Sequence, residues 1–167
     1  MRRAASLGQI CDRAGGSVQT GPFGSQLHQS DYTDIGIPVV MPQDIVGDRV
    51  STEAIARIPD MKARQLSRHA LKAGDVVFPR RGDIGKRALI TEREAGWLCG
   101  TGCLKISTNS EELHSGYLFN YLKLDHVVKW IEQKAVGATM LNLNTGILRS
   151  LEVSFPEWEQ QVRIAEV

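Results

Sequence analysis

A short apolar run that leads into a glycine-containing turn constrains this sequence most. Residues 76–78 are Val-Val-Phe, Pro79 follows them directly, and a second apolar run begins at Ala88. Proline has no amide hydrogen to donate to a sheet, so Pro79 should end the first strand. We therefore expect a β-hairpin here, with its turn between Pro79 and Ala88.

The turn of this expected hairpin carries four cations in a short space: Arg80, Arg81, Lys86 and Arg87. The turn also holds two glycines, which lack a Cβ and let a backbone approach a ligand closely. Cations beside such a backbone suit a phosphate-bearing partner. The alternative is an ordinary solvated hairpin tip. This turn alone does not separate the two interpretations.

The distribution of charge supports a basic face. The whole chain has a net charge of only +1, which says nothing about nucleic acid. Residues 57–93, however, contain ten lysines and arginines against four acids. Such an asymmetry predicts one basic surface, although a solvated charged face is the commoner outcome for any single run.

Length and composition limit the class of protein. A chain of 167 residues that is 42% hydrophobic and 23% charged fits one globular domain with a sizeable core. Cys11, Cys99 and Cys103 form no even disulfide framework, so a reduced, cytoplasmic protein is the simplest interpretation. Cys99 and Cys103 have no matching Cys/His pair, and we expect no metal site. No apolar run approaches the ~20 residues of a membrane span, and the N-terminus lacks the apolar segment of a secretory signal.

Apolar periodicity predicts both strands and helices. Apolar residues recur at helical spacing from Leu113 to Ile131, which predicts one or two core helices ending near Lys134, with Asn109 or Ser110 as the N-cap. Further expected elements are strands near 39–41, 97–99, 104–106 and 151–155, a short helix in 63–71, and a helix from 159 onward. We expect an α+β fold: a single mixed α/β domain with a twisted, largely antiparallel sheet and a few helices.

Polar residues in the loops are candidates for contact with a partner. In the glycine-flanked loop 21–27, we expect Phe23 to be pinned in the core and Ser25 to face a partner. Two later loops add the candidates Gln43, Asp44, Thr139, Asn142 and Asn144. Glutamine and asparagine can pair with adenine, and aspartate can accept from cytosine. All of these residue types also shape turns, and asparagine readily bonds its own backbone.

Catalytic chemistry has no support in the sequence. No spacing of serine, histidine and carboxylates indicates a triad, a metal triad or a cofactor loop, so we expect no catalytic residue and no cofactor. The functional classes left are a DNA-binding module and a protein-interaction module. A third class, a nucleotide-binding enzyme, has weaker support, because the sequence contains no complete phosphate-binding loop.

Several segments together resemble a known family. In order they are Gly21-Pro22-Phe23-Gly24-Ser25, Gly36-Ile37-Pro38-Val39-Val40, Gly74-Asp75-Val76-Val77 with Arg81-Gly82-Asp83-Ile84-Gly85, Asn142-Leu143-Asn144 with Leu148, and Pro156 with Glu159-Gln160 and Ile164-Ala165. Each motif is weak alone, but five in this order are specific. The sequence resembles the target recognition domain of a type I restriction-modification specificity subunit, often called HsdS, from about Leu7 to the end.

The resemblance implies that residues 1–156 are a domain that reads one half of a split DNA sequence in the major groove. It implies that residues 157–167 begin a spacer helix that docks methyltransferase subunits and, through them, the restriction subunit. S-adenosylmethionine is then expected only in the methyltransferase. Trp158, Val162 and Ile164 are the candidate partner contacts, for methyltransferase or for self-association. Where the family usually has Pro-Pro-Leu, this chain has Pro156-Glu157-Trp158. Base-contacting residues vary within the family and are not carried over.

Overall fold

The computed structural model describes residues 2–135 and 141–166. Its α-helices are α1 (Leu7–Ala14), α2 (Asp60–Gln65), α3 (Ser115–Leu122), α4 (Asp125–Lys134), α5 (Thr145–Ser150) and α6 (Trp158–Ala165). Its strands are β1 (Arg3–Ser6), β2 (Ser17–Thr20), β3 (Ile37–Val40), β4 (Ile45–Val46), β5 (Arg49–Val50), β6 (Ala56–Ile58), β7 (Val76–Pro79), β8 (Ala88–Leu89), β9 (Leu98–Cys99), β10 (Cys103–Ser107) and β11 (Glu152–Phe155). Short 3-10 helices are η1 (Gln29–Asp31), η2 (Pro42–Asp44), η3 (Ser67–His69) and η4 (Glu92–Glu94).

The predicted hairpin lies in the middle of the molecule. Strands β7 and β8 pair antiparallel, and Pro79 is the last residue of β7, as the sequence predicted. They form part of a four-stranded antiparallel sheet in the order β2-β10-β7-β8. In this sheet Leu104 of β10 faces Thr20 of β2 on one side and Phe78 of β7 on the other.

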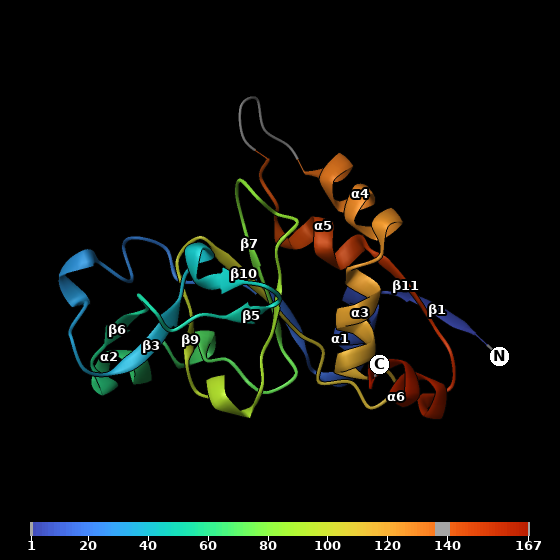
Figure 1. Cartoon of the computed structure of the whole chain (residues 1–167), viewed down its shortest axis with the longest axis horizontal. Coiled ribbons are helices and arrows are strands. Elements are labelled where there is room, and N and C mark those ends of the chain that lie inside the picture. Colours follow the sequence, from blue (N-terminus) through green and yellow to red (C-terminus); the bar gives the residue numbers. More distant parts are fainter. Residues whose placement is uncertain (1, 136–140, 167) are drawn as a thin grey trace.

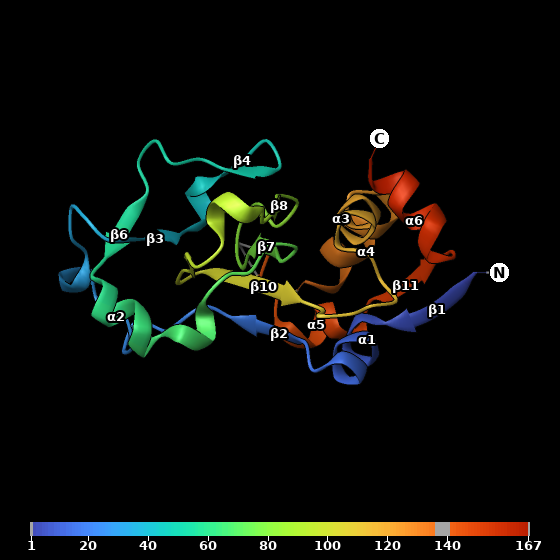
Figure 2. The ribbon, with the colours of Figure 1, turned by 90° about the horizontal axis from the view of Figure 1, so that it is seen from below.

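Helices and strands gather at opposite ends of this sheet. Five of the helices, α1 and α3 to α6, lie at one end, while β3, β6, β9 and α2 lie at the other (Figures 1 and 2). The helical end has one large apolar core, which includes Ile10, Leu122 and Val153. The other end has a smaller core around Val39 and Ile58.

The fold class is confirmed as mixed α/β with largely antiparallel pairing, but the strands form four small sheets rather than one. Besides the central sheet there are β1-β11, β6-β3-β9 and β4-β5. The one parallel pair among the described strands is β3 with β9, where Val39 faces Leu98. The buried side chains likewise form separate clusters rather than one continuous core, which agrees with several small sheets.

The apolar segment from Leu113 to Ile131 forms two helices, within the prediction. Leu124, in extended conformation, separates α3 from α4. The predicted N-cap was wrong: His114 caps α3, because its ring accepts from the amides of Gly116 and Tyr117. Ser110 instead accepts from two nearby amides in the preceding turn.

No helix in residues 2–135 and 141–166 is long and apolar enough to cross a membrane.

Candidate nucleic-acid interface

The cationic hairpin loop packs against a segment from the other end of the chain. The amide of Leu143 donates to the carbonyl of Arg80 at 2.7 Å, and the amide of Gly82 donates to that of Leu141 at 3.2 Å. Arg81 and Asn142 form an isolated antiparallel bridge between these two hydrogen bonds. In Figure 1 the loop after β7 rises beside the chain that leads into α5. Candidate residues some sixty positions apart in the sequence are thereby brought together.

A tight turn, residues 100–102, connects further loops to this pair. The amide of Arg80 donates to the carbonyl of Gly102 at 2.8 Å, and the Thr101 hydroxyl donates to the carbonyl of Pro22 at 2.7 Å. The backbones meet so closely that a Cβ on Gly21 would lie 2.0 Å from the carbonyl oxygen of Gly100. Glycine is therefore required at position 21.

Five loop segments thus converge, since Pro42 at the start of η2 also lies against Gly102. We call this surface the loop face and define it as residues 21–27, 42–44, 80–86, 100–102 and 141–144. Its framework is main-chain hydrogen bonds, so its side chains are presented from fixed positions.

The charge on the loop face is mainly positive. Arg81 and Lys86 are exposed and Arg80 is half-buried, with Asp83 as the exposed acid of the same loop. Among the described residues, Nε of Arg80 and Oδ1 of Asn142 are buried without a hydrogen-bond partner. Three cations on a fixed backbone can hold anionic oxygens at defined positions.

Arg87 does not belong to this set, and the expectation that it is presented with the other cations was wrong. Its side chain is only 2% exposed. Nη1 donates to the carbonyl of Leu122 at the end of α3, Nη2 donates to Gly85 at 3.0 Å, and the guanidinium carbon lies 5.1 Å from the centroid of the Phe78 ring. Burial lowers its pKa, while the carboxylates of Asp48 and Glu132 raise it. Arg87 therefore ties the hairpin to the helical end.

Phe23 also differs from the prediction, but it is exposed where we expected it to be buried. We expected it in the core, but its ring is 56% exposed. The guanidinium carbon of Arg80 lies over this ring, 6.0 Å from its centroid. Ser25, in the same loop, is exposed, and its contact with a partner stays a prediction. The buried apolar residue of this loop is Leu27.

The two η2 candidates have different environments. Gln43 is exposed. Asp44 is buried, and its carboxylate accepts from the amide of Met41 at 2.9 Å, so it closes the 3-10 turn. Burial raises the pKa of Asp44, against the lowering effect of that hydrogen bond. A carboxylate held in this way is not available to a base edge, and the expectation for Asp44 as a base reader is corrected.

The candidate residues that follow α4 also differ in their environments. Asn144 is the N-cap of α5, because its side-chain oxygen accepts from the amide of Ile147 at 2.8 Å. It therefore shapes the loop, which was the alternative weighed for it. Asn142 lies beside Arg81 on the loop face. Thr139 lies outside the described residues.

Sequence comparison supplies the family. A model of the type I restriction modification DNA specificity domain matches residues 62–167. This match covers the cationic hairpin, the segment 141–144 and α6. The chain belongs to this family of DNA specificity domains. Among curated proteins, none matches the sequence.

Solved structures show the same fold as this specificity domain. The HsdS subunit from Thermoanaerobacter tengcongensis superposes with a TM-score of 0.68 at 19% identity, covering 99% of this chain and 40% of that one. The S subunit of a type I restriction-modification system from M. genitalium gives 0.65 at 18%, with 99% and 37% covered. A chain from a structure on complex assembly and conformational transition of the type I R-M system gives 0.69 at 21%, with 99% and 36% covered. The present chain spans about two fifths of the length of these proteins.

The candidate partner contacts predicted from the sequence lie on α6. Trp158 and Ile164 are each 42% exposed, and Val162 is half-buried. Sequence reasoning missed the residue that anchors this helix, the fully buried Gln161. Its Oε1 accepts from the amide of His114 at 2.8 Å, and its Nε2 donates to the carbonyls of Glu112 and Pro156, both at 2.9 Å. The helix therefore packs on its own domain beside α3 (Figure 2).

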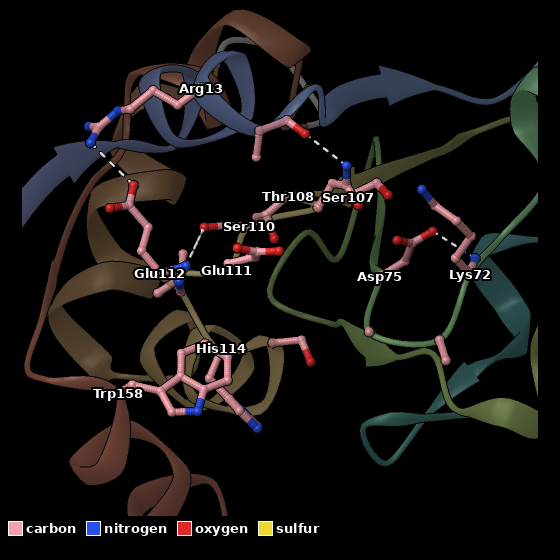
Figure 3. A pocket seen from close by; sticks show the side chains of 16 residues that line it. Arg13, Lys72, Asp75, Ser107, Thr108, Ser110, Glu111, Glu112, His114 and Trp158 are labelled. Carbon is pink, nitrogen blue, oxygen red and sulfur yellow. Dashed lines mark hydrogen bonds and ion pairs between the residues drawn. The ribbon is translucent and has the colours of Figure 1, made fainter.

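A groove of about 1050 Å³ in the specificity domain is lined by residues outside the loop face (Figure 3). Trp158 and His114 stand at one end, with ring centroids 5.2 Å apart, and Asp75 stands at the other. Glu111 and Glu112 also line it, and Glu112 pairs with Arg13 at 3.2 Å. Three carboxylates, of Asp75, Glu111 and Glu112, face two cations, Arg13 and Lys72, in this lining, whereas the loop face is mainly positive, so the loop face is the better candidate for DNA.

Metal and thiol chemistry have little support in the described part of the specificity domain. No group of three or more His, Cys, Asp or Glu residues there could hold a metal ion. All three cysteines are free and buried. Burial raises the pKa of Cys11 to about 11 and that of Cys99 to about 12, so these thiols stay protonated at neutral pH.

Proposed function

We propose that this chain is a sequence-specific, double-stranded DNA-binding module that directs a type I restriction-modification complex to one half of a bipartite site. The observation that carries the proposal is the loop face, where Arg80 and Arg81 lie beside the segment that contains Asn142, on a backbone fixed by hydrogen bonds, and Lys86 is exposed in the same hairpin loop. The family match supports a role in DNA specificity. Such a role would place the protein in the cytoplasm.

The loop face offers two kinds of contact. Arginine and lysine would bind phosphate oxygens, which positions a protein on the duplex without reading its sequence. Gln43 and Ser25, which are exposed, would reach base edges, because amide groups can bond two atoms of adenine and hydroxyls can bond several bases. Asn142 would reach a base edge after a turn of its side chain, because its Oδ1 is buried. Asp44 and Arg87 have structural roles and are left out of this assignment.

Removing two cations from the loop face should weaken binding to every duplex. We expect Arg80→Ala combined with Arg81→Ala to flatten the slope of log K against log salt by roughly one to two units, since each neutralised phosphate contributes about −0.9. The measurement is fluorescence anisotropy with labelled duplexes over a series of salt concentrations. The matched control is Arg64→Ala with Arg163→Ala, which removes two exposed cations from α2 and α6. An unchanged slope in a folded loop-face variant would refute the phosphate contacts.

The same binding assay, preceded by selection from randomised duplexes, addresses base reading. We expect Gln43→Ala and Asn142→Ala each to change the preferred base at one position, with about 1–3 kcal/mol of discrimination lost. If both variants select the parent sequence with the parent preference, these residues do not read bases. Absence of any preferred sequence for the parent chain would refute sequence-specific recognition itself.

The second candidate is a protein-interaction module that binds methyltransferase subunits without reading DNA. The observation that favours it is the apolar exposure of Trp158 and Ile164 on α6. The two roles are compatible, because α6 lies at the helical end and the cationic loop reaches out from the central sheet (Figure 1). In either case we propose that α6, within residues 157–167, begins a spacer element. Catalysis and S-adenosylmethionine binding would then belong to the methyltransferase partner.

Placing a charge on the exposed side of α6 should abolish docking and leave the domain folded. We expect Ile164→Asp to lose capture of the methyltransferase subunit, because it puts a carboxylate in an apolar contact, whereas the neighbouring Arg163→Ala should retain it. The measurement is co-purification, with circular dichroism as the check on folding. Self-association is tested by the same variant in sedimentation. Full capture of the methyltransferase by Ile164→Asp would exclude this surface.

A further inference from the structure

Phe23 is an exposed aromatic residue on a rigid loop. Its amide donates to Oε1 of Gln26 at 3.1 Å, and its carbonyl accepts from the amides of Gln26 and Leu27 at 2.8 and 3.2 Å. On one side the loop is tied through Pro22 to Thr101, and on the other Leu27 is buried. The ring is therefore held out by a fixed backbone. Single exposed apolar side chains are common on protein surfaces, but this ring, at 56% exposure, lies within the loop face, which is the candidate DNA surface.

The surroundings of the ring indicate what that partner is. Phe23 lies in the loop face, with the guanidinium of Arg80 over its ring and Arg81 next along the hairpin. Phosphates would bind the cations, but a phenyl ring offers them no hydrogen bond. Among the groups that a duplex presents in its major groove, the C5-methyl of thymine is the apolar one.

Rather than inserting between base pairs, Phe23 should contact a groove edge. A wedge stacks on the neighbouring bases through its ring faces. The Arg80 guanidinium lies over one face of Phe23, with its carbon 6.0 Å from the ring centroid, and would hinder a base from stacking there. The exposed edge and the remaining face can still pack on a methyl group while Arg80 stays beside a phosphate or a base edge.

We propose that Phe23 is a specificity-determining residue that packs on the C5-methyl group of a thymine in the major groove. The proposal rests on the proposed DNA-binding function and names one base contact within it.

The test uses the duplex selected by the parent chain, with each thymine replaced in turn by deoxyuridine, which lacks only the methyl group. One replacement should weaken parent binding about fourfold, the equivalent of about 0.8 kcal/mol for one buried methyl-sized group. Phe23→Ala should bind the thymine duplex at least fourfold more weakly than the parent does. It should also bind the thymine and deoxyuridine duplexes equally well. Ile35→Ala, at a residue that is 88% exposed outside the loop face, is the matched control and should behave as the parent.

Three outcomes overturn the proposal while leaving DNA binding intact. They are unchanged affinity in Phe23→Ala, a parent that is insensitive to deoxyuridine at every position, and a selected site without thymine. Weaker binding of Phe23→Ala with no deoxyuridine effect in the parent would assign the ring to stacking instead. Absence of any bound duplex would refute the proposed function, and the inference with it.

Discussion

Replacing Arg87 by alanine is expected to lower the free energy of unfolding by about 3–5 kcal/mol. The guanidinium is 2% exposed and donates to the carbonyls of Leu122 and Gly85. Alanine would leave the Leu122 carbonyl buried without a donor and would also remove the packing of the side chain on Phe78. The measurement is urea unfolding at constant pH, followed by circular dichroism.

Lys86 supplies the matched control for this experiment. It is the preceding residue and also a cation, but it is exposed. Lys86→Ala should change stability by no more than about 0.5 kcal/mol. Arg87→Lys should fall between the two, because lysine keeps the charge but cannot bond two carbonyls with a planar fork. Parent-like unfolding of Arg87→Ala together with weaker DNA binding would return Arg87 to the DNA surface.

The contrast between these neighbours shows where sequence reasoning ends. The hairpin was predictable, because an apolar run, a proline and a glycine-containing turn are local signals. The sequence did not predict which of the four cations points inward. Arg87 does so because it donates to the carbonyl of Leu122 at the end of α3, thirty-five residues away. Four cations in one turn therefore look equivalent in the sequence.

Phe23 was misplaced for the related reason that burial is a tertiary property. Large apolar residues are usually buried, and this preference predicted the core. The loop instead buries Leu27 and presents Phe23, because the close contact between Gly21 and Gly100 fixes where the loop lies. A contact between two glycines leaves no pattern in the sequence that a local rule can detect.

Some of the helix N-caps could be predicted from the sequence and others could not. Asparagine is a favoured N-cap, and Asn144 precedes the helical residues 145–150, so its structural role could be foreseen from the sequence. His114 is outside the usual set of capping residues, and the serine and asparagine a few positions earlier were the natural choice. Only the structure shows that His114 is the N-cap of α3.

Truncating Leu122 to alanine is the second change for which we expect a large effect, a loss of about 2–5 kcal/mol. The side chain is fully buried in the large apolar core, at the end of α3. Its removal costs the transfer free energy of the lost methyl and methylene groups, plus that of the cavity they leave. Leu124, two positions later and 44% exposed, is the matched control, and Leu124→Ala should cost well under 1 kcal/mol.

Leu122→Ala and Arg87→Ala probe different interactions at the same end of α3. The Leu122 variant keeps the main-chain carbonyl that accepts from Arg87, whereas the Arg87 variant keeps the leucine side chain. Because the two groups are neighbours, we do not expect the two losses to add in the double variant. Thermal unfolding and DNA affinity should be measured on all three proteins. If Leu122→Ala kept the parent melting temperature but lost affinity for DNA, α3 would be part of the DNA surface rather than of the core.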